Sequence, residues 1–240
     1  MLLRLLLILS FTPIISYSQT SNLTALQVVE NSIAYHDPKD MLQYKTTILE
    51  LRETRPNGPD RKTSLSWNIA KESYQKKISK DDKKIVSFLN KGVVSFYIDN
   101  KETISSDELK KYKLTTDREL MFKNYYQYLW LLPMKLRDEG TIIDPLVKTV
   151  DFFGKRSLQV KVTYEPAIGK DTWYFYVHPE TYALQGYRFY HDESKNDGEY
   201  ILLSGETSYK SVRLPKKRAW YTHKEDKFLG ADILETLSLK

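Results

Sequence analysis

The sequence predicts a mainly β protein with some α-helix: a curved antiparallel sheet of roughly ten strands, forming an incomplete β-barrel, with helices covering its concave face. Three observations predict this fold. Apolar and polar residues alternate along many short segments, as in the apolar series Trp173, Phe175 and Val177. Turn-forming residues separate these segments at hairpin spacing. Two longer segments instead carry apolar residues at helical spacing.

The N-terminus has the pattern of a secretory signal peptide. Arg4 precedes an apolar run that is shorter than a bilayer span. Small residues near the end of that run favour cleavage between Ser18 and Gln19. Residues 1–18 are therefore predicted to be a signal peptide, and residues 19–240 a single exported domain that is periplasmic or secreted.

The composition limits the chemistry and the partners. The chain has no cysteine, which excludes a disulfide, a thiolate metal site and a cysteine-linked lipid anchor. Its formal net charge of +6 suits peripheral contact with an anionic membrane or envelope surface, although the lysines are scattered as on a solvated surface. Export argues against nucleic acid as a partner. We expect a monomer.

The first helix is predicted to begin at Thr24, which can form a capping box with the glutamine three residues on. Its apolar face would carry Leu26, Val29 and Ile33, which recur at helical spacing. A His-Asp-Pro sequence ends the pattern, because proline disfavours helical geometry in the residue before it. A cationic imidazole at His36, favoured by the helix dipole, accounts for that histidine.

The second helix is predicted to start at a capping box formed by Thr116 and Glu119 and to be closed by Pro133. Its stripe of apolar and aromatic residues is Met121, Phe122, Tyr125, Tyr126, Leu129 and Leu132. This stripe is broader than a surface helix needs, so the helix should lie across the sheet.

The remaining segments are predicted to pair in sequence as antiparallel hairpins. The predicted strands are residues 42–54, 64–69, 84–89, 93–98, 148–153, 156–164, 171–178, 184–191, 199–207, 219–223 and 232–239. A sheet of this length must twist and coil, so its concave face needs cover. The two apolar helices supply it, and such a lid over an aromatic trough makes an apolar cavity.

Local sequences carry a resemblance to a known family. Residues 173–181 end a strand in a histidine-proline-glutamate turn, and residues 184–189 return with aromatic and basic side chains. Residues 212–215 enter a late strand through a leucine-proline step. With the order of elements, these features resemble the LolA/LolB-like superfamily of lipoprotein-localisation and sorting proteins. The resemblance spans nearly all of the mature chain, and it implies a half-barrel whose hydrophobic cavity, in the carriers, shields acyl chains.

The chain departs from those carriers because it is longer and its expected interior is rich in tyrosine and tryptophan. The resemblance therefore implies an envelope branch of the superfamily, with a lipid or an acylated protein as partner. The candidates for lining the ligand cavity are Trp67, Phe96, Phe122, Tyr126, Leu129, Trp173 and Phe175. Each of these side chains could instead fill the core.

No motif indicates catalysis or a cofactor. The sequence lacks a G-x-S-x-G elbow, a phosphate loop and an H-E-x-x-H pair. His191, Asp192 and Glu193 resemble a metal or acid–base cluster, but successive strand residues point to opposite faces. Residues 192–197 fail as an EF-hand loop, because the glycine falls one position late. We expect no metal, no cofactor and no enzymatic activity.

Three functions remain open. The first is an exported carrier whose apolar cavity accepts an acyl chain, lipid or lipoprotein, with basic rim residues attracting an anionic headgroup. The second is an envelope interaction or scaffold protein with a filled core and no ligand. The third is a glycan-directed hydrolase, which would need two carboxylates that meet across a cleft only in space.

Overall fold

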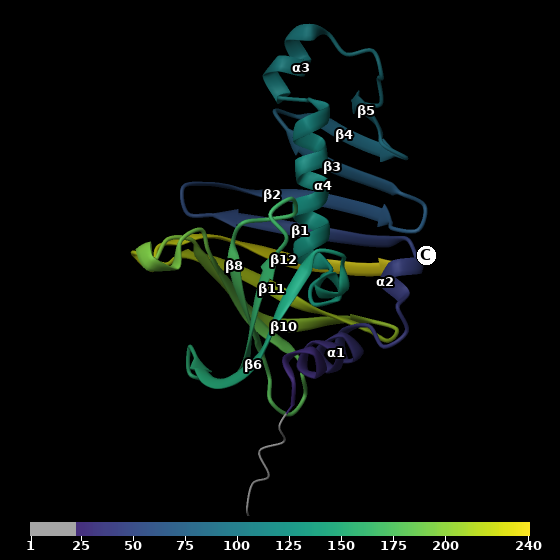
Figure 1. Cartoon of the computed structure of the whole chain (residues 1–240). Helices are drawn as coiled ribbons and strands as arrows, with labels where there is room; N and C mark the ends of the chain where they lie inside the picture. Colours follow the sequence, from purple (N-terminus) through teal and green to yellow (C-terminus); the bar gives the residue numbers. More distant parts are fainter. Residues whose placement is uncertain (1–22) are drawn as a thin grey trace, which may run out of the picture.

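The computed structural model describes residues 23–240 (Figure 1). The predicted signal peptide, residues 1–18, and its cleavage site after Ser18 lie outside the described residues. The described part contains one sheet of twelve antiparallel strands, in the order β5-β4-β3-β2-β1-β12-β11-β10-β9-β8-β7-β6. The ends of this order, β5 and β6, do not pair, so the barrel is incomplete. The predicted fold class is confirmed.

The twelve strands are β1 (Thr47–Arg55), β2 (Gly58–Asn68), β3 (Ser73–Lys80), β4 (Lys83–Asn90), β5 (Val93–Ile98), β6 (Thr141–Phe152), β7 (Lys155–Tyr164), β8 (Thr172–Val177), β9 (Leu184–Tyr190), β10 (Glu199–Tyr209), β11 (Val212–Thr222) and β12 (Phe228–Leu239). The helices are α1 (Ala25–His36), α2 (Met41–Tyr44), α3 (Ser106–Tyr112), α4 (Thr116–Trp130) and the 3-10 turns η1 (Met134–Arg137) and η2 (Glu193–Lys195).

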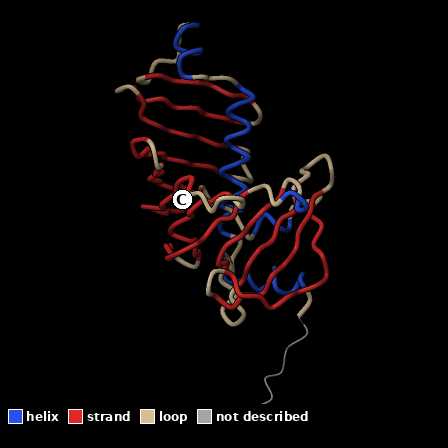
Figure 2. The backbone as a smooth tube through the Cα atoms, turned by 90° about the vertical axis from the view of Figure 1, so that its left-hand side faces the viewer, coloured by secondary structure: helices blue, strands red, loops and turns tan. Residues whose placement is uncertain are grey.

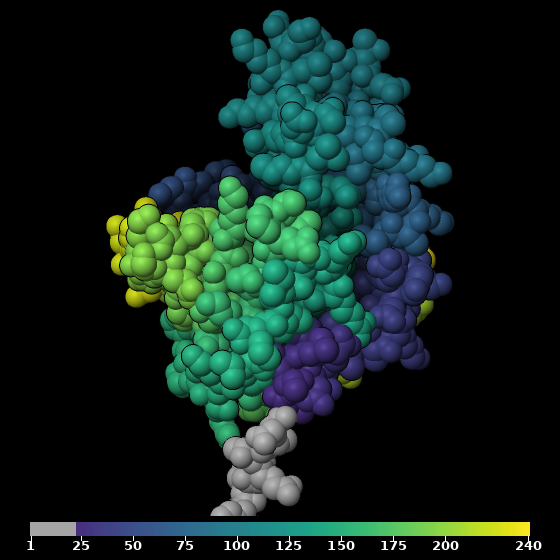
Figure 3. All heavy atoms as spheres, viewed as in Figure 1, coloured from purple at the N-terminus to yellow at the C-terminus, as the bar shows by residue number. Residues whose placement is uncertain are grey.

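Pairing of the last strand with the first joins two halves of the sheet. Strands β1–β5 continue one side of this junction, and β11 back to β6 continue the other. Figures 1 and 2 show α4 running across the strands of the first half towards the curled second half. Figure 3 shows the part around β3–β5 and α3 projecting from a broader body. None of the described helices is long and apolar enough to cross a membrane.

Helix α1 begins as predicted, because Thr24 and Gln27 form the capping box. The prediction for its buried face is wrong at Leu26, which is 57% exposed, while Val29 and Ile33 are buried. The helix packs on β6, β7 and β11 through a face turned away from Leu26, which includes Val28.

The prediction of a cationic imidazole at His36 is also wrong. This side chain is 2% exposed, and its two ring nitrogens bond the backbone. Nδ1 lies 2.6 Å from the carbonyl oxygen of Arg213, and Nε2 accepts from the amide of Leu184 at 3.0 Å. Burial lowers the pKa of His36 to about 4. The neutral ring therefore ties α1 to β9 and β11.

Helix α4 starts one residue away from the predicted capping box. Its N-cap is Thr115, whose hydroxyl accepts from the amide of Arg118, so the expected box between Thr116 and Glu119 is absent. Glu119 instead points into the protein and accepts from Lys76 Nζ at 2.7 Å. Helix α3, which Ser105 caps, was not predicted from the sequence.

Strand β3 was not predicted because a lysine occupies one of its inward positions. Lys76 is 7% exposed, lies against Glu119 and stacks 3.9 Å from the ring centroid of Phe122. Strand β6 begins earlier than expected, at Thr141, and contains an irregularity around Pro145. Strand β3 adds one to the eleven segments predicted from the sequence and brings the sheet to twelve strands.

Candidate functional site

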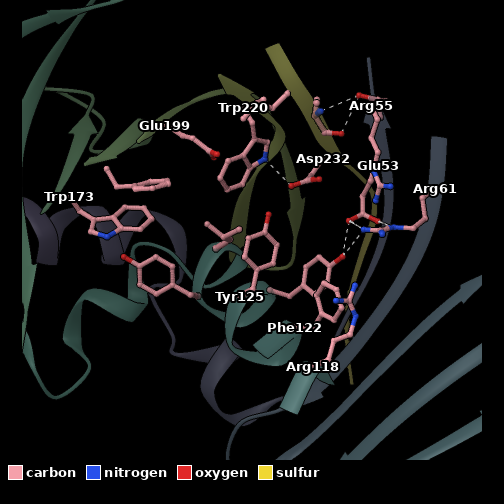
Figure 4. A pocket seen from close by; sticks show the side chains of 18 residues that line it. Glu53, Arg55, Arg61, Arg118, Phe122, Tyr125, Trp173, Glu199, Trp220 and Asp232 are labelled. Carbon is pink, nitrogen blue, oxygen red and sulfur yellow. Dashed lines mark hydrogen bonds and ion pairs between the residues drawn. The ribbon is translucent and has the colours of Figure 1, made fainter. Parts of the chain in front are cut away.

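A pocket of about 700 Å³ lies between α4 and the concave face of the sheet, near the junction of β1 with β12. Its volume falls within the range of about 300–1,000 Å³ that is typical of small-molecule sites. Figure 4 shows the side chains that surround it. The aromatic lining residues are Phe122, Tyr125, Tyr126, Tyr128, Trp173, Phe189 and Trp220.

The register of β8, β9 and β10 builds the aromatic end of the pocket. Trp173 pairs with Phe189, and Phe189 pairs with Glu199, so the three side chains share one face of the sheet. The rings of Trp173 and Phe189 stack with centroids 4.8 Å apart. From α4, Tyr128 meets Trp173 edge to face at 5.3 Å and bonds the hydroxyl of Tyr164. This end is therefore rigid and apolar, with one carboxylate at its border.

A row of charged residues lies at the other end, where Glu53, Arg61 and Asp232 line the pocket. Arg218 pairs with Asp232, Asp232 with Glu53, and Glu53 with Arg61, across β11, β12, β1 and β2. Directly paired residues point to the same face, so two carboxylates lie side by side between two guanidinium groups. We refer to these four residues as the charged row.

Glu53 is fully engaged within the protein. It accepts from Arg61 Nε at 2.6 Å and Nη2 at 2.7 Å, from the hydroxyl of Tyr126 at 2.7 Å and from the hydroxyl of Thr63. Burial alone would raise the pKa of Glu53, but the hydrogen bonds and charge of Arg61 outweigh it, and the pKa is lowered. Glu53 is therefore an ionised carboxylate with its lone pairs occupied.

Asp232 lies beside Glu53 in a different state. Its Oδ2 accepts from the indole nitrogen of Trp220 at 3.1 Å, while no group within residues 23–240 donates to Oδ1. Burial, followed by the negative charge of Glu53, raises the pKa of Asp232 to about 6. The two neighbouring carboxyls thus have pKa values that are displaced in opposite directions.

Arg218 is a buried member of the charged row. It is 1% exposed, and its guanidinium carbon lies 3.6 Å from the ring centroid of Trp130. It donates to the carbonyl oxygens of Pro215 and Leu129, each at 3.2 Å. Leu129 is in the last turn of α4, where the helix dipole favours a cation. Arg218 therefore fastens the end of α4 to the sheet.

Glu199 borders the aromatic end. Its side chain is half-buried and makes no hydrogen bond or ion pair with any of the residues that the structure describes. Burial raises its pKa, and the charge of His191 offsets only part of that effect. In Figure 4 its carboxyl group points towards the Trp220 ring.

The structure brings together four of the seven side chains predicted to line a cavity. Phe122, Tyr126, Leu129 and Trp173 border the pocket. The other three lie elsewhere: Trp67 and Phe175 are each 1% exposed within the packed core, and Phe96 is half-buried on β5. They do not line this pocket, because inward-facing residues of a curved sheet also pack against one another.

Sequence reasoning missed the polar part of the pocket. Tyr125 was assigned only to the helix stripe, and the charged row was not recognised. Its members come from opposite ends of the chain, so only the pairing of β1 with β12 brings them together. No local sequence signal could have identified them.

The histidines lie outside the pocket. The exposed ring of His191 bonds Asp171 at 2.8 Å, and His178 accepts from backbone amides in the turn after β8. Within the described part of the chain, no three His, Asp or Glu side chains are grouped so as to hold a metal ion.

Comparisons with solved structures show the fold. The chain is similar to a LolA superfamily protein from Nitrosomonas europaea, with 8% identity, a TM-score of 0.55, and coverage of 91% of this chain and 94% of that one. It is also similar to a protein from Vibrio parahaemolyticus described as an outer membrane lipoprotein-sorting domain. The identity is 10%, the TM-score is 0.54, and the match covers 90% of this chain and 92% of that one. A DUF1329 family protein from Desulfovibrio piger is similar with 10% identity and a TM-score of 0.52, and the match covers 90% of this chain and 93% of that one. The predicted resemblance to the LolA/LolB-like superfamily is thus confirmed at the level of the fold.

A search of curated protein sequences found no relative. A family model does match, over residues 4–235, and so covers nearly the whole chain. The chain therefore belongs to the family of unknown function DUF6503.

Proposed function

We propose that this protein is an exported, non-enzymatic binding protein that holds the apolar part of an amphipathic ligand in the pocket beneath α4. The observation that carries the proposal is the pocket itself, about 700 Å³ in volume and lined by seven aromatic side chains. Burial of an apolar chain there would contribute about 0.8 kcal/mol per methylene group. The half-barrel fold supports the same function, since one similar structure is described as a lipoprotein-sorting domain.

The pocket favours this proposal over a scaffold with a filled core. Tyr125 remains 42% exposed although its ring stacks on Trp220, with centroids 6.2 Å apart. A ligand lying along α4 would cover both rings. Exposed apolar surface inside a concave site is typical of ligand binding.

A hydrolase is the less favoured alternative. Neighbouring carboxyls with displaced pKa values, such as Glu53 and Asp232, can act as an acid–base pair. However, Glu53 is bound by Arg61, Thr63 and Tyr126, which leaves no lone pair directed at a substrate or water. The arrangement supports binding better than general base catalysis.

The compartment and the partner follow from the same proposal. The signal peptide pattern of residues 1–18 would deliver the protein to the periplasm or outside the cell. A lipid or an acylated protein from the envelope is the kind of ligand that this compartment offers, and a monomer would suffice to enclose its apolar chain.

Native mass spectrometry of the mature protein, purified without detergent and followed by organic extraction, tests the proposal. We expect a reproducible bound amphiphile, or uptake of a fluorescent fatty acid by the empty protein. Tyr125→Ala should weaken that uptake about tenfold, because it removes one aromatic wall. Tyr44→Ala is the matched control, since Tyr44 is 67% exposed on α2. An empty protein that takes up no probe would refute the proposal.

A further inference from the structure

We propose that Glu199 anchors a positively charged group of the ligand, so that the pocket takes a cationic amphiphile such as an alkylammonium compound. This inference rests on the proposed binding function and adds the charge of the headgroup. It differs from the sequence-based expectation of an anionic headgroup drawn to basic residues at the rim.

Glu199 has no bonded partner among the residues that the structure describes. It is half-buried, no side chain donates a hydrogen bond to it, and the charge of His191 offsets only part of the effect of its burial. A carboxylate taken out of water without a partner is costly. Both carboxylates of the charged row are bonded within the protein, Glu53 by Arg61 and Asp232 by Trp220. Glu199 is thus the lining carboxylate that would gain most from a bound cation.

Aromatic side chains surround Glu199. Phe189 is its direct cross-strand partner, and Trp173 stacks on Phe189. Trp220 is its diagonal neighbour on β11, two residues before Thr222, with which Glu199 pairs. Trimethylammonium and related groups bind where aromatic faces and a carboxylate meet, because the ring faces are electron-rich. A carboxylate and three aromatic side chains thus meet at this end of the pocket.

The arginines of the pocket are poor anchors for an anion. Arg61 is committed to Glu53 through two nitrogens. Arg118 is exposed and lies over the ring of Phe122 at 4.8 Å, and Arg55 is exposed at the end of β1. Exposed guanidinium groups are well solvated, so an anion gains little from them. The polar interaction that burial strengthens is therefore at Glu199.

Isothermal titration calorimetry with three chain-matched probes tests this inference: decyltrimethylammonium and decanoate, each below its micellar concentration, and decanol below its solubility limit. We expect decyltrimethylammonium to bind about tenfold more tightly than decanol, with decanoate weakest. Glu199→Gln should abolish the preference for the ammonium probe and leave the affinity for decanol within about twofold. Unchanged decanol binding also shows that the variant keeps its pocket. Glu165→Gln, at an exposed position that makes no side-chain hydrogen bond, is the matched control.

The outcomes separate the two proposals. Equal binding of the three probes, tighter binding of decanoate, or an ammonium preference that survives Glu199→Gln would overturn the cationic headgroup while leaving the binding function standing. If none of the probes binds, both proposals fall.

Discussion

Replacing Asp232 with asparagine should stabilise the protein at neutral pH. Raising the pKa of this carboxyl from 3.8 to about 6 means that folding disfavours its ionised form by about 3 kcal/mol, since one pKa unit corresponds to about 1.4 kcal/mol. The value of about 6 already includes the attraction of Arg218 and Arg61. Asparagine has nearly the shape of the protonated carboxyl, and its oxygen can still accept from Trp220.

The size of the effect depends on pH. In the folded wild type Asp232 holds its proton up to about pH 6, whereas in the unfolded chain it loses the proton near its ordinary pKa. The wild type therefore loses stability as pH rises through this interval. The advantage of Asp232→Asn should grow from near zero at about pH 4 to about 3 kcal/mol at pH 7 and above.

Urea unfolding followed by circular dichroism at several values between pH 4 and pH 8 measures this difference. Glu165→Gln removes one exposed carboxylate and should change stability little at any pH. The reasoning is refuted if Asp232→Asn destabilises the protein at pH 8, or if its effect is the same at both ends of the range.

Three further predictions concern buried polar contacts. Lys76→Met should lower the free energy of unfolding by about 3–5 kcal/mol, because it leaves Glu119 buried without its cation. The double variant Lys76→Met/Glu119→Leu should recover most of that loss in urea unfolding. A double variant no more stable than the single one would contradict this. Tyr126→Phe should lower the free energy of unfolding by about 1–3 kcal/mol, because it removes a hydrogen-bond donor to Glu53. Tyr44→Phe, at an exposed tyrosine, should leave stability unchanged. Equal effects of the two substitutions would show that the Glu53 contact is unimportant. In the Asp232→Asn variant, the free energy of unfolding should fall by up to about 3 kcal/mol between pH 6.5 and pH 4. The reason is that burial lowers the pKa of His36 to about 4, so protonation of its ring favours the unfolded chain. A flat profile over this range would rule out a neutral buried imidazole.

Local sequence patterns predicted elements well where burial follows them. The capping box at Thr24 and the alternation around Trp173 identified α1 and β8 correctly. Prediction failed where a polar residue occupies an inward position, as Lys76 does on β3, because its partner Glu119 comes from a distant helix. His36 was misread for the same reason, since its partners lie on β9 and β11.

The candidate site was less predictable than the fold. Three of its aromatic side chains and Leu129 were named as cavity candidates from helix and strand patterns, but the charged row exists only through the register of β12 between β1 and β11. This register depends on the pairing of β1 with β12, which are far apart in the sequence, so no short window of sequence specifies it.

Two carboxyls at the pocket, Asp232 and Glu199, differ from the buried carboxyls Glu53 and Glu119 in whether a cation is bonded to them. Glu53 and Glu119 are buried, and each has a cation within 2.7 Å. Asp232 and Glu199 are at the pocket and have no such partner, and burial raises the pKa of both. A protein selected for stability alone would replace them with neutral side chains. Local violations of this kind are expected where function depends on them, and both lie beside Trp220, where a bound cation would relieve the cost. The stabilisation expected from Asp232→Asn and the loss of cation preference expected from Glu199→Gln are therefore two measurements of one property, a pocket whose negative charge is left for a ligand to neutralise.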